Sequence, residues 1–299
     1  MKKKHKLDLF DVINGVLLIV LMFIILYPLY YTIIASFSDP QEVASGNVTW
    51  KIVGFSLDAY KHVFQNNQIW IGYGNTIFYT VFGTMLNIVL TIPAAYVLSK
   101  PYLPHKKFLM GFFLFTMYFG GGMIPTYFLV KNMGLINTRA CLVLLGGISI
   151  YNLIVTKSFF MSSIPESLFE AAEIDGAGEI KKFFAIAIPL SKSILAVMVL
   201  YYAVAHWNSY FNALLYISDK SLEPLQQVLR RILLLNENAL NVDTSQLSME
   251  ELLDSAKRSW LAYTMKYALV FIASAPLLIA YPFVQKYFVK GTMIGAVKE

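Results

Sequence analysis

The sequence has few of the residues on which most soluble proteins and enzymes depend. Only 14% of its 299 residues are charged, against roughly 25% in an average soluble domain. Its single cysteine, Cys141, lies inside an apolar run, which excludes a disulfide framework and a cysteine-based metal site and favours simple packing. No stretch matches the G-x-x-x-x-G-K-[ST] phosphate loop, so we expect no nucleotide hydrolysis by this chain.

Apolar residues are abundant instead. They make up 57% of the chain, which includes 22 Phe and 19 Tyr, and the mean hydropathy is +0.59. Crossing a bilayer as a helix takes about 20 mostly apolar residues, and several windows have that length. The sequence therefore predicts an all-α integral membrane protein with six transmembrane helices. The predicted spans are residues 12–37, 71–99, 108–130, 140–160, 191–216 and 263–288.

The basic residues indicate how the chain is oriented. Four lysines precede the first apolar run, which is longer than a signal-peptide core, so we interpret it as a retained span. The short segment "KPYLPHKK" (100–107) holds three lysines, whereas the longer segment 38–70 holds only Lys51 and Lys61. Loops rich in lysine and arginine stay in the cytoplasm. Both termini are therefore predicted inside, and the net charge of +6 serves orientation rather than nucleic-acid binding.

This orientation divides the chain into parts with different surroundings. Residues 1–70 form the cytoplasmic N-terminus, the first transmembrane helix and an outer loop. Residues 71–288 form a five-helix transmembrane domain, and residues 289–299 form a cytoplasmic tail. Within the domain, residues 161–190 (the inner loop) face the cytoplasm, and residues 217–262 lie outside, where "LEPLQQVLRRILLL" has helical spacing.

The inner loop has the pattern of two short helices. Ser163 and Glu166 have the spacing of a capping box, and Pro165 is placed in the first turn. Gly176 stands where a glycine in the left-handed conformation would end the first helix. A second helix is predicted to begin near Gly178 and to end before Pro189.

The charges of this loop fit a protein partner better than a lipid surface. Helices that lie on a membrane usually offer Lys and Arg to anionic headgroups, whereas the first helix offers Glu166, Glu170 and Glu173. One predicted apolar stripe runs through Ile164, Leu168, Ala171 and Ala172, and a second through Ile180, Phe183, Phe184, Ala187 and Ile188, while Lys181 and Lys182 face elsewhere. Small residues permit close approach of a second backbone.

The same stretch, "EAAEIDGAGEIKKFFAIAIPL", resembles the EAA loop of the permease subunits of binding-protein-dependent ABC importers. The matching positions are Glu170, Ala171, Ala172, Asp175, Gly176, Ala177, Ile186, Pro189 and Leu190. In that family the loop is a coupling helix that docks into a groove of a cytoplasmic ATPase. The resemblance implies this role for Glu170, Ala171, Ala172, Asp175, Gly176, Ala177, Pro189 and Leu190.

Further segments resemble the carbohydrate branch of the family, the maltose-type sugar permeases. These are "NTIFYTVFGTMLNIVLTIPAAYVLSK", "HWNSYFNALLYISD" and the ending "KGTMIGAVKE". The glycine run in "YFGGGMIPTYFLVKNMGL" and the long segment 217–262 are typical of a subgroup that handles oligosaccharides. The resemblance implies a type I ABC importer permease fold and import of a sugar or oligosaccharide.

The resemblance also implies a set of partners. These are a second homologous permease forming a heterodimer, a cytoplasmic ABC ATPase dimer and an extracytoplasmic solute-binding protein. The chain itself is expected to be no enzyme and to hold no cofactor or metal, since ATP and Mg are bound by the partner ATPase. The expected location is the bacterial cytoplasmic membrane.

Polar residues inside spans are costly and tend to face a bundle interior or a cavity. The candidates are Asn75, Asn87, Asn152, His206, Asn208 and Asn212. Sugars are bound by planar hydrogen-bonding groups together with aromatic rings. We therefore predict a substrate path lined by Trp207, Asn208, Tyr210, Asn212 and Asn87. An interfacial anchoring role for the aromatic residues is the alternative.

Three other classes of function remain as alternatives. A permease for a peptide or polyamine would share the inner loop. A secondary transporter would need ionisable residues in mid-span, and apart from His206 the chain has almost none there. A membrane-embedded enzyme would need paired carboxylates or clustered histidines, whereas the four histidines are scattered.

Overall fold

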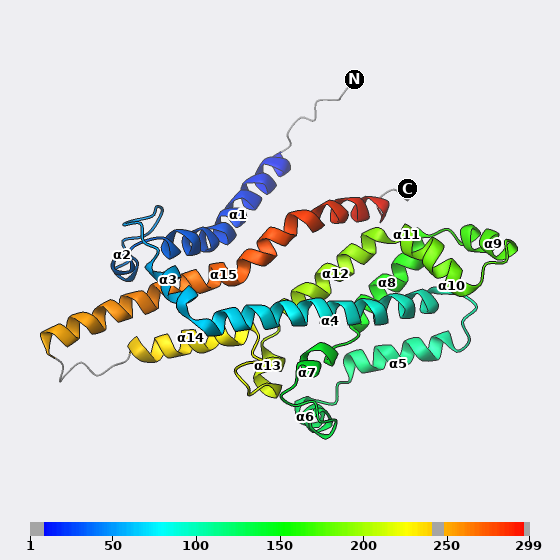
Figure 1. The fold of residues 1–299 in the computed structure, drawn as a ribbon. Helices are drawn as coiled ribbons and strands as arrows, with labels where there is room; N and C mark the ends of the chain where they lie inside the picture. Colours follow the sequence, from blue (N-terminus) through cyan, green and yellow to red (C-terminus); the bar gives the residue numbers. More distant parts are fainter. Residues whose placement is uncertain (1–8, 241–247, 296–299) are drawn as a thin grey trace. The chain divides into compact units, whose positions relative to one another are not determined.

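The structure is a computed structural model that describes residues 9–240 and 248–295. These residues form helices and loops without a strand, and an isolated bridge pairs Ser38 with Phe55. They divide into two compact units, residues 9–67 with 229–240 and 248–275, and residues 68–228 with 276–295. The predicted all-α class is confirmed (Figure 1). The basic residues 2–6 and the end of the predicted tail, 296–299, lie outside the described residues.

The first unit is built around the first helix. It contains α1 (Leu9–Ser36), α2 (Pro40–Ala44), α3 (Asp58–Gln65), the second part of α14 (Leu225–Leu240) and the first part of α15 (Met249–Gly295). The last turns of α1 pack Ile34 and Ala35 against Val43 and Val48. The most apolar window of α1 has no buried residue. Most of this helix therefore exposes aliphatic side chains.

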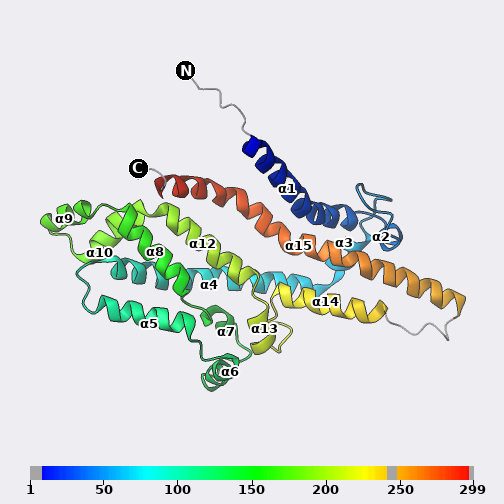
Figure 2. The same cartoon turned by 180° about the vertical axis from the view of Figure 1, so that it is seen from behind.

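The second unit contains the other helices. They are α4 (Asn67–Ser99), α5 (Lys106–Tyr118), α6 (Met123–Asn132), α7 (Arg139–Leu144), α8 (Ile150–Ser163), α9 (Glu166–Ile174), α10 (Glu179–Lys182), the π-helix η1 (Phe183–Ala187), α11 (Ile188–Leu190), α12 (Lys192–Trp207) and α13 (Phe211–Tyr216). Side chains from α4, α8, α9 and α12 share one apolar core. Both views show α9 and α10 beyond the ends of α8 and α12 (Figures 1 and 2).

The predicted spans agree with the structure in part. Helices Leu9–Ser36, Asn67–Ser99 and Met249–Pro282 are long and apolar enough to cross a membrane, and up to five spans result if each of two bent pairs counts as one. The helix predicted in "LEPLQQVLRRILLL" is confirmed as α14. The count of six stays a prediction.

Three predicted spans are interrupted rather than continuous. The region 108–130 bends by 109° between α5 and α6, next to Gly122 with φ +84°. The region 140–160 breaks between α7 and α8, where Gly146 has φ +77°. The region 191–216 breaks between α12 and α13. Glycine adopts these backbone angles without the penalty that a Cβ would add.

Candidate functional site

The inner loop is a helical hairpin with a sharp stop at the end of α9. The Ala177 N–H donates to the Ala172 carbonyl at 2.8 Å and the Gly176 N–H to the Glu173 carbonyl at 2.9 Å. This pair of bonds is a Schellman motif, which needs a left-handed residue at its centre. Gly176 has φ +75°, so the predicted stop is confirmed. The second helix begins as predicted, with Gly178 as the N-cap of α10.

The predicted capping box is wrong. Pro165, not Ser163, is the N-cap of α9, and no side chain caps this helix. Ser163 is the last residue of α8. The physical reason is Pro165, which disfavours helical geometry in the residue before it: Ile164 is extended, with φ −111° and ψ 115°. The chain thus leaves α8 before α9 begins.

Tyr96 of α4 forms an aromatic seat for the loop. Its ring centroid lies 5.9 Å from that of Phe160 in α8, 6.0 Å from Phe169 in α9 and 5.1 Å from Phe183 in η1. The Tyr96 hydroxyl also donates to Glu179 Oε2 at 3.2 Å. Aromatic pairs at these separations contribute about 1 kcal/mol each beyond their buried area. The loop is therefore held on the ends of α4 and α8.

Lys182 fixes the two short helices to each other. Its Nζ lies 2.8 Å from Glu173 Oε2 and 3.1 Å from Glu179 Oε1, and 5% of its side chain is exposed. The hydrogen bond to Glu173 is the largest cause that raises the pKa of Lys182. Burial raises the pKa of Glu179, but hydrogen bonds from Lys182, Tyr102 and Tyr96 outweigh it and lower that pKa. This cluster (Glu173, Glu179 and Lys182) is called the lysine clasp below.

The outward side of the loop is apolar and uncovered. Ile174 is 88% exposed, and Leu168, Ile180 and Phe184 are also exposed. A hollow of about 530 Å³ is lined by Gly178, Glu179, Ile180, Lys181, Phe184 and Ala185. Phe169, rather than Leu168, packs against the core. Of the predicted stripe, Ile164 is buried in that core and Ala172 is half-buried, whereas Leu168 and Ala171 are exposed.

The residues assigned by resemblance are mostly exposed. Glu170, Ala171, Asp175 and Gly176 are exposed, and Ala172 and Ala177 are half-buried. Pro189 and Leu190 are exposed in α11, where η1 and a bend of 81° join the loop to α12. The inner loop therefore presents an exposed surface rather than an enclosed substrate site.

The predicted substrate-path residues are only partly brought together. Trp207 is buried, with its ring 6.2 Å from that of Tyr73. Asn208 is the exposed C-cap of α12, Tyr210 is half-buried and Asn212 is exposed in α13. These four lie at the break between α12 and α13. Their role in transport stays a prediction.

Asn87 lies elsewhere and has its hydrogen-bonding groups occupied. Its Nδ2 donates to the carbonyls of Gly146 and Gly147 at 2.9 Å each, and its Oδ1 faces His206 Nε2 at 2.7 Å. A Cβ added at Gly83 would meet the His206 ring, so glycine is needed for this close approach. Asn87 thus satisfies backbone groups freed by the break between α7 and α8.

The sequence interpretation missed Phe169, Lys100 and the inward position of Lys182. The spacing of Glu179 and Lys182, three apart on a helix, is a signal for an ion pair. Lys100 follows α4 directly and its side chain is 5% exposed. A lysine at the end of a span is usually an orientation signal, and nothing local distinguishes this one.

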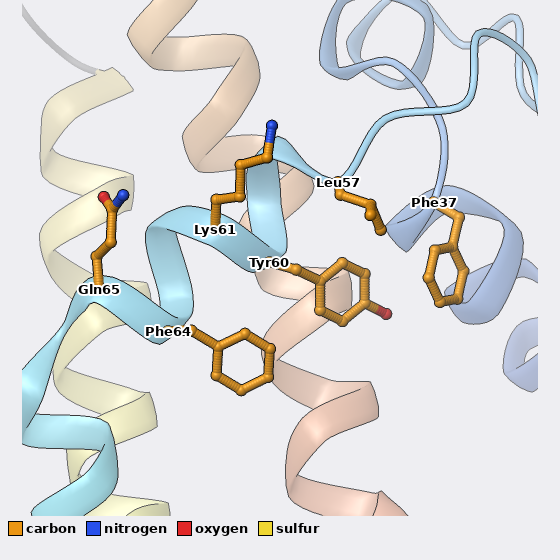
Figure 3. Close-up of a pocket in the computed structure, with 6 residues that line it drawn as sticks. All are labelled: Phe37, Leu57, Tyr60, Lys61, Phe64 and Gln65. Atoms are coloured by element: carbon orange, nitrogen blue, oxygen red, sulfur yellow. The ribbon is translucent and has the colours of Figure 1, made fainter.

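A second hollow lies in the first unit, about 560 Å³ in volume (Figure 3). Phe37, Leu57, Tyr60 and Phe64 form its apolar wall, with Lys61 and Gln65 beside them. Figure 3 shows the rings of Tyr60 and Phe64 on one side of α3, with Lys61 and Gln65 extending away from them. Among the described residues, no group of three or more His, Cys, Asp or Glu side chains is arranged to hold a metal ion.

Comparison with known proteins finds similarities that cover most of the chain. Residues 69–293 match a family model described as "Binding-protein-dependent transport system inner membrane component". Protein LplC of Bacillus subtilis (strain 168) is 41% identical over 290 residues, covering 97% of this chain and 95% of LplC. The polygalacturonan/rhamnogalacturonan transport system permease protein YtcP of the same organism is 38% identical, covering 97% and 98%.

A solved structure is also similar. It is the crystal structure of a bacterial ABC transporter involved in the import of the acidic polysaccharide alginate. The similarity has a TM-score of 0.82 and 32% sequence identity, and it covers 93% of this chain and 96% of that one.

Proposed function

The chain belongs to the family of binding-protein-dependent transport system inner membrane components, and on that premise we propose that it forms half of the translocation path of an oligosaccharide importer. Its fold is that of a type I ABC importer permease. It is a non-catalytic membrane subunit that works with an ATPase and a solute-binding protein. ATP and Mg belong to the ATPase.

Names of relatives support an oligosaccharide as cargo. YtcP is named for polygalacturonan and rhamnogalacturonan, and the similar solved transporter imports alginate. These polysaccharides are acidic, so we propose uronate-containing oligosaccharides as the substrate class. The proposed path includes Trp207, Asn208, Tyr210 and Asn212, with a second, homologous permease supplying the other half of a heterodimer.

The uncovered apolar side of the inner loop carries the coupling role. Ile174, Ile180 and Phe184 are exposed on a hairpin that the aromatic seat and the lysine clasp hold rigid. A rigid hairpin with an apolar face is suited to docking into a groove, because it loses little conformational entropy on binding. We propose that the ATPase binds Glu170–Ala177 with the adjacent hollow, that Pro189 and Leu190 carry its movement into α12, and that both chain termini share that cytoplasmic side.

Replacement of Ile174 by Asp tests this docking. Ile174 is 88% exposed, so the substitution leaves the chain's own core intact and places a charge on the proposed interface. We expect the ATPase to be lost when the variant complex is purified from membranes, and uptake to fall at least about tenfold. The binding protein recovered with the wild-type complex identifies the cargo by its bound solute.

The matched control is Met133→Asp, the same change of charge at a residue that is 61% exposed. Met133 lies in residues 131–139, which follow the predicted span 108–130 and are therefore predicted to lie outside. This variant should keep the ATPase. If Ile174→Asp retains the ATPase and normal uptake, the docking role is wrong. A bound solute without sugar character would contradict the cargo.

A further inference from the structure

The backbone at the end of α4 is unusually well fixed. Lys106 Nζ donates to the carbonyls of Ser99 and Lys100, at 3.1 Å and 3.0 Å. The Lys100 N–H donates to the Val97 carbonyl at 3.1 Å. Carbonyls at a helix C-terminus lack partners within the helix, and a lysine can satisfy them. The side chain of Lys100 thus starts from a rigid base.

The ammonium of Lys100 lies between an aromatic ring of α4 and one of α9. Its Nζ is 3.2 Å from the ring centroid of Phe169 and 4.9 Å from that of Tyr96. Glu166 Oε1, also in α9, is 3.9 Å away. A cation over aromatic faces is attracted to both, more strongly when shielded from water. One buried charge therefore joins the second predicted span to the first helix of the inner loop.

This arrangement is costly for an orientation signal. A lysine that only orients a span can stay in water, whereas burial removes its hydration. An aliphatic residue of similar length would fill the same space without that cost. The cation adds a preference for one relative position of Phe169 and Tyr96, because its attraction falls with distance from each ring.

We propose that Lys100 is a positioning residue for energy coupling. It holds α9 in a fixed position against the end of α4, so that a displacement of the inner loop also moves α4. The inference rests on the proposed docking of an ATPase to the same loop. Lys100 is buried where the end of α4 meets α9, so on this proposal it touches neither the ATPase nor the solute. Its effect is on how much transport each hydrolysed ATP yields.

The surroundings of Lys100 make its charge more sensitive to a rise in pH than the charge of Lys182. Burial lowers the pKa of Lys100, Lys182 lowers it further, and Glu166, Glu179 and Glu173 oppose this. The pKa of Lys182 is raised by Glu173, and burial raises that of Tyr102 to about 12. Burial also lowers the pKa of Lys106. As pH rises, Lys100 and Lys106 lose charge before Lys182 does.

The test uses the intact complex with its binding protein in proteoliposomes, comparing Lys100→Met, Lys100→Arg and the control Lys107→Met. Lys107 is exposed and lies in the same segment as Lys100, residues 100–107, at the start of α5. The measured quantity is the number of ATP molecules hydrolysed per solute imported. We expect Lys100→Met to keep the ATPase bound and to raise this ratio about tenfold, with Lys100→Arg and Lys107→Met close to wild type.

A pH series supplies a second readout. As pH rises through the lowered pKa of Lys100, the ratio should rise in wild type and stay flatter in Lys100→Arg, because arginine remains charged and Lys106 is common to both. If the Lys100→Met complex does not assemble, the comparison of the pH profiles of wild type and Lys100→Arg tests the proposal by itself. Equal pH profiles, or a proportional fall of uptake and hydrolysis at constant ratio, would overturn the proposal. Absence of the ATPase from the wild-type complex would instead refute the docking itself.

Discussion

Lys181 and Lys182 are adjacent and chemically identical, yet the fold uses them in opposite ways. Lys181 is exposed beside the hollow of the inner loop, while Lys182 is buried in the lysine clasp. The difference comes from the helix that carries them, since successive helical residues point about 100° apart. Lys182 therefore faces Glu173 and Glu179, and Lys181 is left for solvent or a partner.

The lysine clasp is expected to control how often the hairpin opens. In Lys182→Met, two carboxylates remain close to each other without a cation. We expect backbone amides around Ala177 and Gly178 to exchange hydrogen several-fold faster in this variant, measured by mass spectrometry on the detergent-solubilised complex. Lys181→Met is the control and should exchange at the wild-type rate. Equal rates in both variants would show that the clasp carries no stability.

The same clasp sets a pH limit. The pKa of Glu179 is lowered in the folded chain from its ordinary value of 4.5, so its contribution to stability is present above that value and is lost as pH falls through the lowered pKa. The pKa of Lys182 is raised, so its contribution is lost only as pH rises through the raised value. Hairpin protection should therefore be constant across neutral pH.

Gly176 and Gly178 show that the hairpin of the inner loop restricts side chains through backbone geometry rather than through lack of space. A Cβ at either position would meet nothing within 4 Å, but Gly176 has φ +75° and Gly178 has φ −69°. A side chain is strained at the first and tolerated at the second. Steric arguments alone would treat the two glycines as equivalent.

Substitution of these glycines by alanine should separate the two effects. Gly176→Ala is expected to destabilise the hairpin by about 1 kcal/mol, from the left-handed backbone. Gly178→Ala should cost less, because φ −69° suits alanine and only the preference of the N-cap for glycine over alanine is lost. Uptake in cells and ATPase retention are the measurements, with uptake reduced in the first variant. Similar uptake in both would mean that the Schellman turn is not needed for coupling.

The helix stop at Gly176 was predictable from sequence, because a Schellman motif involves only neighbouring residues. The breaks in the predicted spans were not. Hydropathy is averaged over a window and does not register a local turn such as that at Gly146. Asn87 shows the remaining limit: its partners, Gly146, Gly147 and His206, are up to 119 positions away. The contact of Lys100 with Phe169 is hidden for the same reason.

At the scale of the whole chain, the predicted orientation depends on the lysines of short loops. The chain has one cysteine, Cys141, which is fully buried. Its replacement by alanine removes one small buried side chain, and the resulting protein has no thiol to react. Single cysteines can then report which side of the membrane a residue occupies.

Two positions give opposite expectations in the Cys141→Ala background. Gln65→Cys, in the predicted outer segment, should react with a membrane-impermeant maleimide in intact cells. Lys107→Cys, at an exposed position in the segment 100–107, should react only after the membrane is opened, because that segment is predicted to be cytoplasmic. The degree of labelling on gels or by mass spectrometry is the measurement. The reverse pattern would invert the topology and remove the ATPase from reach of the hairpin.

The bare perimeter of α1 has a consequence for assembly. In a membrane, the exposed apolar side chains between Leu9 and Tyr30 would contact either lipid acyl chains or another subunit. These two surroundings are equally apolar. Association through this helix therefore gains little from expulsion of water and depends on how well side chains interlock compared with lipid. The stoichiometry of the complex should then vary with bilayer thickness and with the detergent chosen for extraction.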